Sequence, residues 1–344
     1  MGFSDLLWDE DCQLFPDHHT VLEYLEQYAT DIRHLIKFQT RVVDVSPLGT
    51  TQWTVRSKPM TTSDDSTCAE EVFDAVLVAS GHFEVPYVPS VSGIEAWNEA
   101  YPGRILHSKS YRRPEDFEDK KVVVVGNSAS GVSGDMELYI AIYTNVLLQV
   151  DIASQISKFC ASPLLQSTKD SAESGQDHGS SIVQKPEIEA YVVDNSTVRF
   201  EDGTTESGVD AVLYCTGYFY SYPFLLSLNP PVITTGERVE NLFQHIFYQS
   251  RPTLAFAALN QKIIPFPVAE AQSAVIARVW SGRLELPSER DMELWENQTL
   301  EESGGRSIWS KGLILADRAI GGRNFHVLKF PKDADYINML HGWG

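Results

Sequence analysis

The sequence predicts an α/β fold built around doubly wound parallel sheets, in which buried strands alternate with helices. Continuous apolar runs occur at 73–81, 120–126 and 211–217, with the sequences FDAVLVASG, KKVVVVG and AVLYCTG. Such runs are typical of parallel strands that helices cover on both faces. The first and third runs end alike, in VLVASGH and VLYCTGY. That similarity suggests that the chain crosses between two domains at two neighbouring points.

Composition and charge narrow the class of protein. The chain has 344 residues, enough for two domains of roughly 150 residues. Its net charge of −20 repels phosphate backbones and anionic lipid, so we expect neither nucleic acid nor membrane as a partner. The sequence does not indicate an oligomeric state. Four distant cysteines without C-x-x-C spacing favour reduced thiols and a cytoplasmic location over a disulfide framework or metal site; they are Cys12, Cys68, Cys160 and Cys215.

Other segments show the periodicity of helices and strands. Residues 20–29 place apolar side chains on one face of a short predicted helix, with Thr20 as its N-cap. Residues 268–281 also have helical periodicity, and 36–47 and 51–57 read as strands. The amphipathic, aromatic tail at 323–343 is consistent with a segment that docks on the fold.

A glycine-rich turn follows the run of four valines at 122–125. Gly126 permits a tight turn, Ser128 replaces the middle glycine of G-x-G-x-x-G, and Gly131 lets strand and helix pack closely. With Asn127 and Ser130, these residues form a predicted cradle for a dinucleotide pyrophosphate at a helix N-terminus. The alternative is a tight strand–helix turn that holds no ligand.

The next predicted strand bears on the choice of nucleotide. Sites for NAD usually carry an acidic residue about 20 residues downstream, whereas sites for NADP need a cation. The stretch PLLQSTKD at 163–170 ends in Ser167, Thr168 and Lys169. Lys169 fits a 2′-phosphate, but it reads equally well as a solvated loop charge.

Several motifs together carry a resemblance to a known family. YPGRILHSKSY at 101–111 is similar to the F-x-G-x-x-x-H-x-x-x-[WY] fingerprint of the flavin-containing monooxygenases, with Tyr101 in place of Phe. GNSASG at 126–131 resembles their NADPH-binding turn, and CTGY at 215–218 their second interdomain crossing. The stretch 265–288 resembles their C-terminal flavin-domain helix. The chain thus resembles a fungal-like branch of this family over nearly its whole length.

The resemblance implies two Rossmann-like domains. Residues 1–81 and 215–344 would form a remnant FAD-binding domain, and residues 82–214 an NADPH-binding domain. The implied activity is a monooxygenase that uses FAD, NADPH and O2 to oxygenate a small molecule, for example in secondary metabolism. Because the flavin carries the hard chemistry, such an enzyme needs neither a catalytic triad nor a metal cluster.

The resemblance also assigns roles to fingerprint residues. His107 would position the NADP-linked hinge, although a histidine packed in a linker is the alternative. Tyr111 ends the fingerprint, where Baeyer–Villiger enzymes tend to have Trp. It therefore favours oxygenation of a soft nitrogen or sulfur centre over insertion of oxygen beside a ketone.

Further positions are implied near the cofactors. Gly81, Thr216 and Gly217 would lie at the interdomain crossings. Gln272 would lie near the flavin; the alternative is that its side chain only caps backbone groups or packs in the core.

The N-terminus departs from the family pattern. The family opens with a strand and a G-x-G-x-x-G turn for the FAD pyrophosphate, whereas MGFSDLLWDED resembles a stretch well downstream of that turn. Met1 therefore resembles an internal methionine. Without that first unit the FAD domain would be incomplete, and we expect Val76 and Val78 to face water or to misassemble. An inactive truncated relic is accordingly an alternative to a working enzyme.

A second departure interrupts the helix after the glycine-rich turn. Without the 18 residues 132–149, the sequence reads GNSASGVDIASQIS, an uninterrupted turn and helix like those of the family. Val132-Ser133 and Gln149 can be encoded by splice-site-like sequences, so our hypothesis is a retained in-frame intron. The competing interpretation is a genuine insertion loop.

We expect a chain that lacks residues 132–149 to melt at a higher temperature than the full chain. The deletion restores a continuous helix behind the glycine-rich turn and removes an apolar stretch that must otherwise find cover. Thermal unfolding of both proteins checks this expectation, and a lower melting temperature for the shortened chain contradicts it.

Overall fold

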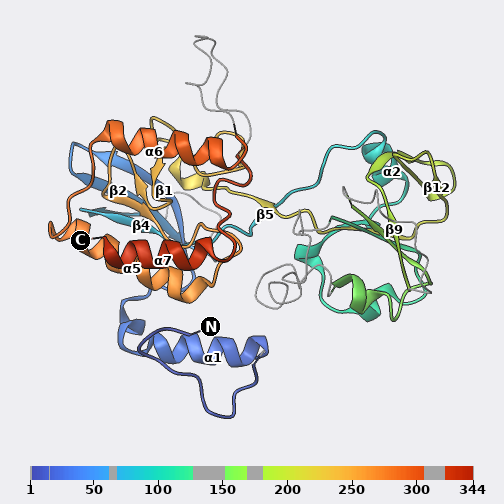
Figure 1. Ribbon diagram of the computed structural model, residues 1–344, viewed down its shortest axis with the longest axis horizontal. Helices are drawn as coiled ribbons and strands as arrows, with labels where there is room; N and C mark the ends of the chain where they lie inside the picture. The colour runs from blue at the N-terminus through green and yellow to red at the C-terminus, as the bar shows by residue number, and fades with distance from the viewer. Residues whose placement is uncertain are drawn as a thin grey trace, which may run out of the picture. The chain divides into compact units, whose positions relative to one another are not determined.

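The computed structural model describes residues 2–14, 16–61, 68–126, 152–168, 181–305 and 322–343. The chain divides into two compact units (Figure 1). The outer unit contains residues 1–82 and 220–344, and the inserted unit contains residues 83–219. The insertion of one unit into the other follows from two chain crossings, one after His82 and one before Tyr220.

The inserted unit is built on a five-stranded parallel sheet. Its strand order is β6 (Ile105–His107), β13 (Ala211–Tyr214), β7 (Val122–Val125), β8 (Leu164–Ser167) and β9 (Ile182–Lys185). The valines of the central strand β7 alternate between two cores. Val122 and Val124 pack with Ile156, whereas Val123 packs with Trp97 on the opposite face. The predicted doubly wound parallel sheet is therefore confirmed.

Smaller elements cover the two faces of this sheet. Helix α2 (Ile94–Ala100) contributes to one core together with an antiparallel sheet of β10 (Ile188–Val192), β11 (Thr197–Phe200) and β12 (Thr205–Glu206). The helical turns at 152–156 and Pro114–Phe117 contribute to the other core. Short 3₁₀ turns also lie at Ser108–Ser110 and Asp194–Ser196. A two-stranded ribbon pairs β5 (Val85–Pro86) with β14 (Tyr218–Phe219), where the chain enters and leaves the unit.

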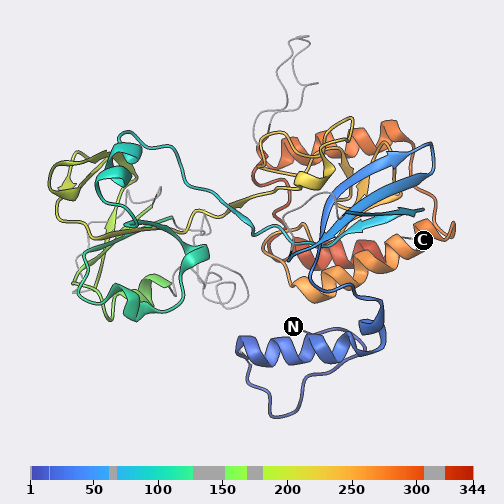
Figure 2. The same ribbon diagram turned by 180° about the vertical axis from the view of Figure 1, so that it is seen from behind.

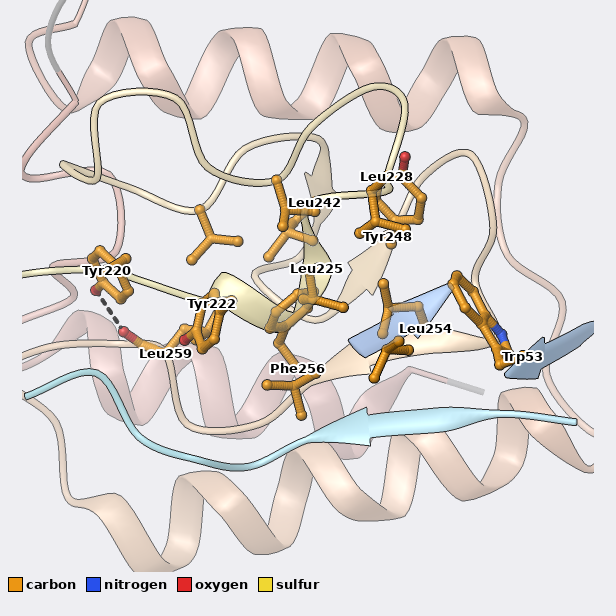
Figure 3. Close-up of a cluster of buried hydrophobic side chains, with 14 residues drawn as sticks. Trp53, Tyr220, Tyr222, Leu225, Leu228, Leu242, Tyr248, Leu254, Phe256 and Leu259 are labelled. Atoms are coloured by element: carbon orange, nitrogen blue, oxygen red, sulfur yellow. Dashed lines mark hydrogen bonds between the residues drawn. The ribbon is translucent and has the colours of Figure 1, made fainter. Parts of the chain in front are cut away.

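The outer unit contains two sheets with a core between them. One is an antiparallel sheet of β1 (Thr40–Leu48), β2 (Gln52–Pro59) and β3 (Ala69–Phe73). The other has the order β15 (Leu242–Phe243), β16 (Phe247–Tyr248), β17 (Leu254–Phe256) and β4 (Val76–Val78), and its β17–β4 pair is parallel. Figure 3 shows the core, to which Trp53, Tyr222, the 3₁₀ turn Pro223–Leu225 and Phe256 contribute.

Helices complete the outer unit. Helices α5 (Pro265–Trp280) and α7 (Lys332–Gly342) share a core with Ile246, Phe247 and Ala255 of the strand region. Helix α6 (Glu289–Glu302) contacts β15. Both ribbon views show α6 on one side of the strands and α5 with α7 on the other (Figures 1 and 2). The predicted helix near 268–281 and the docked tail are both present.

The N-terminal helix differs from its prediction. Helix α1 spans His18–Tyr28, a 3₁₀ turn follows at Thr30–Leu35, and the N-cap is Asp17 rather than Thr20. The Asp17 carboxylate accepts the Thr20 backbone N–H at 2.9 Å, so the helix begins three residues earlier than expected. Of this helix only Tyr24 is buried, while Leu22 is 53% exposed. The apolar pattern at 20–29 thus marks a helix but not a core face.

The expectation for Val76 and Val78 was wrong. Val78 is 5% exposed and packs in the core between the two sheets, and Val76 packs against the same core. Leu77 is instead 40% exposed, because it points to the opposite face of the sheet. Strand β4 lies at the edge of its sheet among the described strands.

We expect Trp53→Ala to lower the free energy of unfolding of the outer unit by about 3–5 kcal/mol. The ring is fully buried, its indole N–H donates to Thr253 Oγ1 at 2.9 Å, and the Arg251 guanidinium lies 4.7 Å from the ring centroid. Urea unfolding checks this value. Leu226→Ala, at a site 85% exposed, is the control and should change the free energy by less than about 0.5 kcal/mol. Similar values for the two variants would contradict this account of the core.

Candidate functional site

Three backbone segments meet at Gly126, which follows β7. Its φ is 108°, and its N–H donates to the Ser167 carbonyl at the end of β8, at 3.0 Å. On the other side, the Cys215 N–H donates to the Val125 carbonyl at 2.8 Å. A Cβ at position 126 would lie 2.9 Å from the Cys215 carbonyl oxygen. Only glycine combines this left-handed backbone with so close an approach.

This turn lies at the carboxyl edge of the parallel sheet. From β7 the sheet continues through β8 to β9 on one side, whereas β13 and β6 lie on the other side. In doubly wound sheets, ligands bind beyond the carboxyl ends of the strands at such a switch point. The position of Gly126 therefore fits the cradle of a dinucleotide. The remaining predicted cradle residues, Asn127, Ser128, Ser130 and Gly131, lie outside the described residues, as does the insertion at 132–149.

The carboxyl end of β8 carries buried polar groups. Ser167 is 1% exposed, and its hydroxyl donates to the Pro186 carbonyl at 2.8 Å, so this side chain holds the β9–β10 connection. Lys169 lies outside the described residues. Lys185, which the sequence reasoning missed, pairs in register with Ser167, but its ammonium lies 2.9 Å from Glu206. The only feature of the sequence that could have pointed to Lys185 is a basic residue at the end of a strand.

His107 joins the 101–111 fingerprint to the segment around Gly217, by which the chain leaves the inserted unit. Its Nε2–H donates to the Gly217 carbonyl at 3.0 Å, and its Nδ1 accepts the Lys109 N–H at 3.1 Å. Because the carbonyl can only accept, these two bonds fix a neutral tautomer. Burial lowers the pKa of His107, while the Gly217 bond raises it and the Lys109 charge lowers it. His107 is therefore a neutral side chain that holds the Gly217 carbonyl by a hydrogen bond.

A backbone clip ties the two crossing segments together within the inserted unit. The Tyr87 N–H donates to the Gly217 carbonyl at 2.9 Å, and the Thr216 hydroxyl donates to the Tyr87 carbonyl. The predicted positions His107, Thr216 and Gly217 are thus brought together. Sequence reasoning missed Tyr87, since its contribution is made by backbone groups that any residue except proline offers.

Tyr111 links the fingerprint to the helical turn at 152–156. Its hydroxyl donates to Gln155 Oε1 at 2.8 Å, and its ring stacks near Phe117 with centroids 6.1 Å apart. Gln155 is a third residue that sequence reasoning missed, because the insertion separates it from the glycine-rich turn. These contacts give Tyr111 a positioning role in the inserted unit.

In the outer unit, Gly81 and Gln272 have separate environments. Gly81 has φ 72°, and its carbonyl accepts the Tyr222 hydroxyl at 3.5 Å. Gln272 is fully buried in α5; its Oε1 accepts the Ala258 N–H at 2.7 Å, and its Nε2 donates to Asn260 and Tyr336 at 3.0 Å. Its amide therefore joins α5 to the loop at residues 258–260 and, through Tyr336, to α7.

The described residues contain part of the predicted phosphate-binding turn for NADPH in the inserted unit but no such turn for FAD in the outer unit. The inserted unit has a strand that ends in a glycine at the predicted pyrophosphate position. In the outer unit, β17 leads to α5 through residues 257–264, which contain no glycine, and β4 leads through Gly81 into the inserted unit. A glycine-rich turn between a strand and a helix, as a flavin pyrophosphate requires, is therefore not found among the described residues of the outer unit.

Metal sites and membrane-spanning helices are two further classes of functional feature. Among the residues that the structure describes, no three His, Cys, Asp or Glu side chains group as metal ligands. No helix in the described ranges has both the length and the apolar character needed to cross a bilayer.

Comparison with solved structures supports the fold. The S-allyl-L-cysteine S-oxygenase of Allium sativum is 28% identical, with a TM-score of 0.77 over 100% of this chain and 71% of that one. Tmm from Pelagibacter sp. strain HTCC7211 is 20% identical, with a TM-score of 0.71 over 99% of this chain and 68% of that one. The second match bears on the fold alone.

Curated relatives point to the same group of proteins. Flavin-containing monooxygenase FMO GS-OX-like 4 of Arabidopsis thaliana is 36% identical over 303 residues, which is 86% of this chain and 61% of that protein. Its FMO GS-OX1 is 34% identical over 302 residues, or 85% of this chain and 60% of that protein. The chain therefore spans about three fifths of the length of the curated relatives it matches.

A family profile covers most of the chain. The profile described as Flavin-binding monooxygenase-like matches residues 1–159 and 179–311. These ranges include the 101–111 fingerprint, the turn at Gly126 and helix α5. The match, together with the two-unit α/β architecture, shows that this chain belongs to the flavin-binding monooxygenase-like family.

Proposed function

We propose that the protein is an FAD- and NADPH-dependent monooxygenase that uses O2 to oxygenate a soft sulfur or nitrogen centre of a small molecule. Proteins of its family bind FAD and NADPH. The observation that carries the proposal is the convergence of β7, β8 and β13 at Gly126, where a nucleotide phosphate can approach the backbone. We assign NADPH to the inserted unit on this ground.

Sulfur is the favoured centre. The structural neighbour from Allium sativum is described as an S-oxygenase of S-allyl-L-cysteine. Tyr111 occupies the fingerprint position where Trp would favour ketone insertion, and its hydroxyl is used to hold Gln155. These two observations support oxygenation at a thioether over a Baeyer–Villiger reaction.

The chain's own residues bind and orient rather than react. The bound flavin supplies the redox chemistry, which no protein side chain provides. Gly126 lets the chain turn away from the sheet directly beside the Cys215 carbonyl, and the Ser167 hydroxyl holds the β9–β10 connection through the Pro186 carbonyl. His107, in its neutral tautomer, fixes Gly217 and thereby the returning chain next to that turn. Its low pKa keeps this bond unchanged near neutral pH.

A relic that binds NADP(H) weakly and oxygenates nothing is the second candidate. It is favoured by one observation, which is that the described outer unit offers no glycine-rich turn between a strand and a helix for the FAD pyrophosphate. The two candidates differ in whether the chain holds flavin, since both allow a nucleotide at Gly126.

Flavin binding and NADPH consumption distinguish the two. We expect the purified protein, supplied with FAD, to show protein-bound flavin absorbance, and to oxidise NADPH faster when an S-alkyl cysteine is added. The sulfoxide product, identified by mass spectrometry, completes the measurement. A colourless protein that quenches no FAD fluorescence and makes no sulfoxide overturns the monooxygenase proposal in favour of the relic.

We expect Gly126→Ala to weaken NADPH binding at least about tenfold, a loss of about 1.4 kcal/mol. The added Cβ would lie 2.9 Å from the Cys215 carbonyl and must displace the turn. Fluorescence titration of NADPH measures the affinity.

Gly203→Ala is the matched control for that variant. Gly203 also has a positive φ, of 80°, but a Cβ there would meet nothing within 4 Å. It carries the same kind of backbone strain, about 1–2 kcal/mol, without the collision. NADPH affinity should be unchanged in this control, and equal losses in both variants would show that Gly126 has no particular role in binding.

A further inference from the structure

Two buried histidines join the C-terminal segment to the strands of the outer unit. His245 lies between β15 and β16, and His326 lies in the stretch that leads to α7. They are 3% and 1% exposed, and their Nδ1 atoms are 3.0 Å apart. The rings are therefore in direct hydrogen-bonding contact, although they lie 81 positions apart in the sequence.

A backbone amide decides which nitrogen carries each proton. The Val239 N–H donates to His326 Nε2 at 3.1 Å, so that nitrogen must be a bare acceptor. Neutral His326 then carries its proton on Nδ1 and donates to His245 Nδ1. The proton of His245 consequently lies on its own Nε2. The contact fits one tautomer of each ring.

This arrangement has no place for a third proton. The facing Nδ1 atoms share one proton, and His245 Nε2 carries the second. A third proton on His326 Nε2 would face the Val239 N–H, and a second proton between the Nδ1 atoms would set two donors against each other. Every singly protonated form of the pair thus replaces a hydrogen bond with a repulsive contact.

The surroundings offer no compensating negative charge. The groups near the pair are Arg238 on the preceding loop, Tyr220 beside His82, Tyr336 on α7, and Glu296 on α6. Glu296 is engaged by Arg238 at 2.6 Å, by the Asn241 N–H at 2.9 Å and by Gln249 at 2.9 Å. Within the described residues, no carboxylate is hydrogen-bonded to either imidazole.

Burial has the effect expected for such a pair. It lowers the pKa of His245 to about 3. It lowers the pKa of His326 as well, and the charges of His245, Arg238 and His82 add to that effect. Both rings are therefore neutral in the folded protein near neutral pH.

We propose that the His245–His326 contact is an acid-sensitive latch, in which protonation separates the rings and loosens the segment 322–343 from the outer unit. That segment carries α7, whose Tyr336 and Leu340 pack in the core with α5. Loosening it would expose this core and free the Nε2 of Gln272 from Tyr336. The latch concerns the outer unit alone and does not depend on the proposed enzymatic activity.

The direction of the pH effect follows from the two states. In the open latch both histidines reach water and have the ordinary histidine pKa of about 6.5. Since the pKa values in the closed latch are lower, the latch is fully effective above about pH 6.5 and weakens as the pH falls below it. Two histidines that gain protons on opening should make the closed state about 100-fold less favoured at about pH 5.5 than at about pH 7.5.

Hydrogen exchange of the full chain tests the proposal. Amide protection, corrected for intrinsic exchange rates at each pH, should fall about 100-fold at 322–343 between those two values. Protection at 188–200, in the inserted unit, should change much less. A parallel change in both regions, or none at 322–343, overturns the latch.

A conservative variant isolates the pair. In His245→Asn the side-chain oxygen can still accept the His326 proton but does not titrate, so the fall in protection should shrink to about tenfold. The control is His34→Asn, since His34 is an exposed histidine in the turn after α1, and it should keep the full effect. A His245→Asn protein that retains the full fall refutes the assignment. If that variant does not fold, the exchange of the unaltered chain alone decides.

Discussion

Close approach of three backbones at the carboxyl end of β7 is the constraint on which the inserted unit depends. Val122–Val125 can be buried on both faces because β13 and β8 flank the strand and two cores cover it. This central position requires a glycine at 126. The Gly126 N–H donates to the Ser167 carbonyl, and the missing Cβ makes room for the Cys215 carbonyl. A strand this enclosed leaves the sheet through a residue without a side chain, because only glycine combines this backbone conformation with so close a neighbouring carbonyl.

The crossing segments show how neutral polar groups can hold a site. The His107 imidazole and the Tyr87 N–H donate to the Gly217 carbonyl, and the Thr216 hydroxyl donates to the Tyr87 carbonyl. None of these contacts needs a charge, and the lowered pKa of His107 keeps its ring uncharged. The geometry near Gly217 therefore depends on hydrogen-bond direction, which changes little with ionic strength.

In the outer unit, buried polar groups are also held by partners, and here some of the groups are charged. Glu296 and Arg238 are both buried and face each other at 2.6 Å, because an unpaired charge at that depth would be strongly destabilising. Gln272 connects α5 to α7 through a fully used amide. The pair of His245 and His326 differs in one respect, since its bonding pattern is complete only while both rings stay neutral.

The sequence by itself determined the buried strands at 122–125 and 211–214, the glycine that ends the first, the helix after residue 264 and the family fingerprint. These features are local, because burial, turn geometry and helical period leave their marks on consecutive residues. Only the tertiary structure decided that Leu77 rather than Val78 is uncovered, that Asp17 caps α1, and that the Ser167 hydroxyl holds Pro186. It alone also paired His245 with His326, 81 positions apart, since a contact between distant segments depends on how whole sheets and helices pack, which no short stretch of sequence encodes.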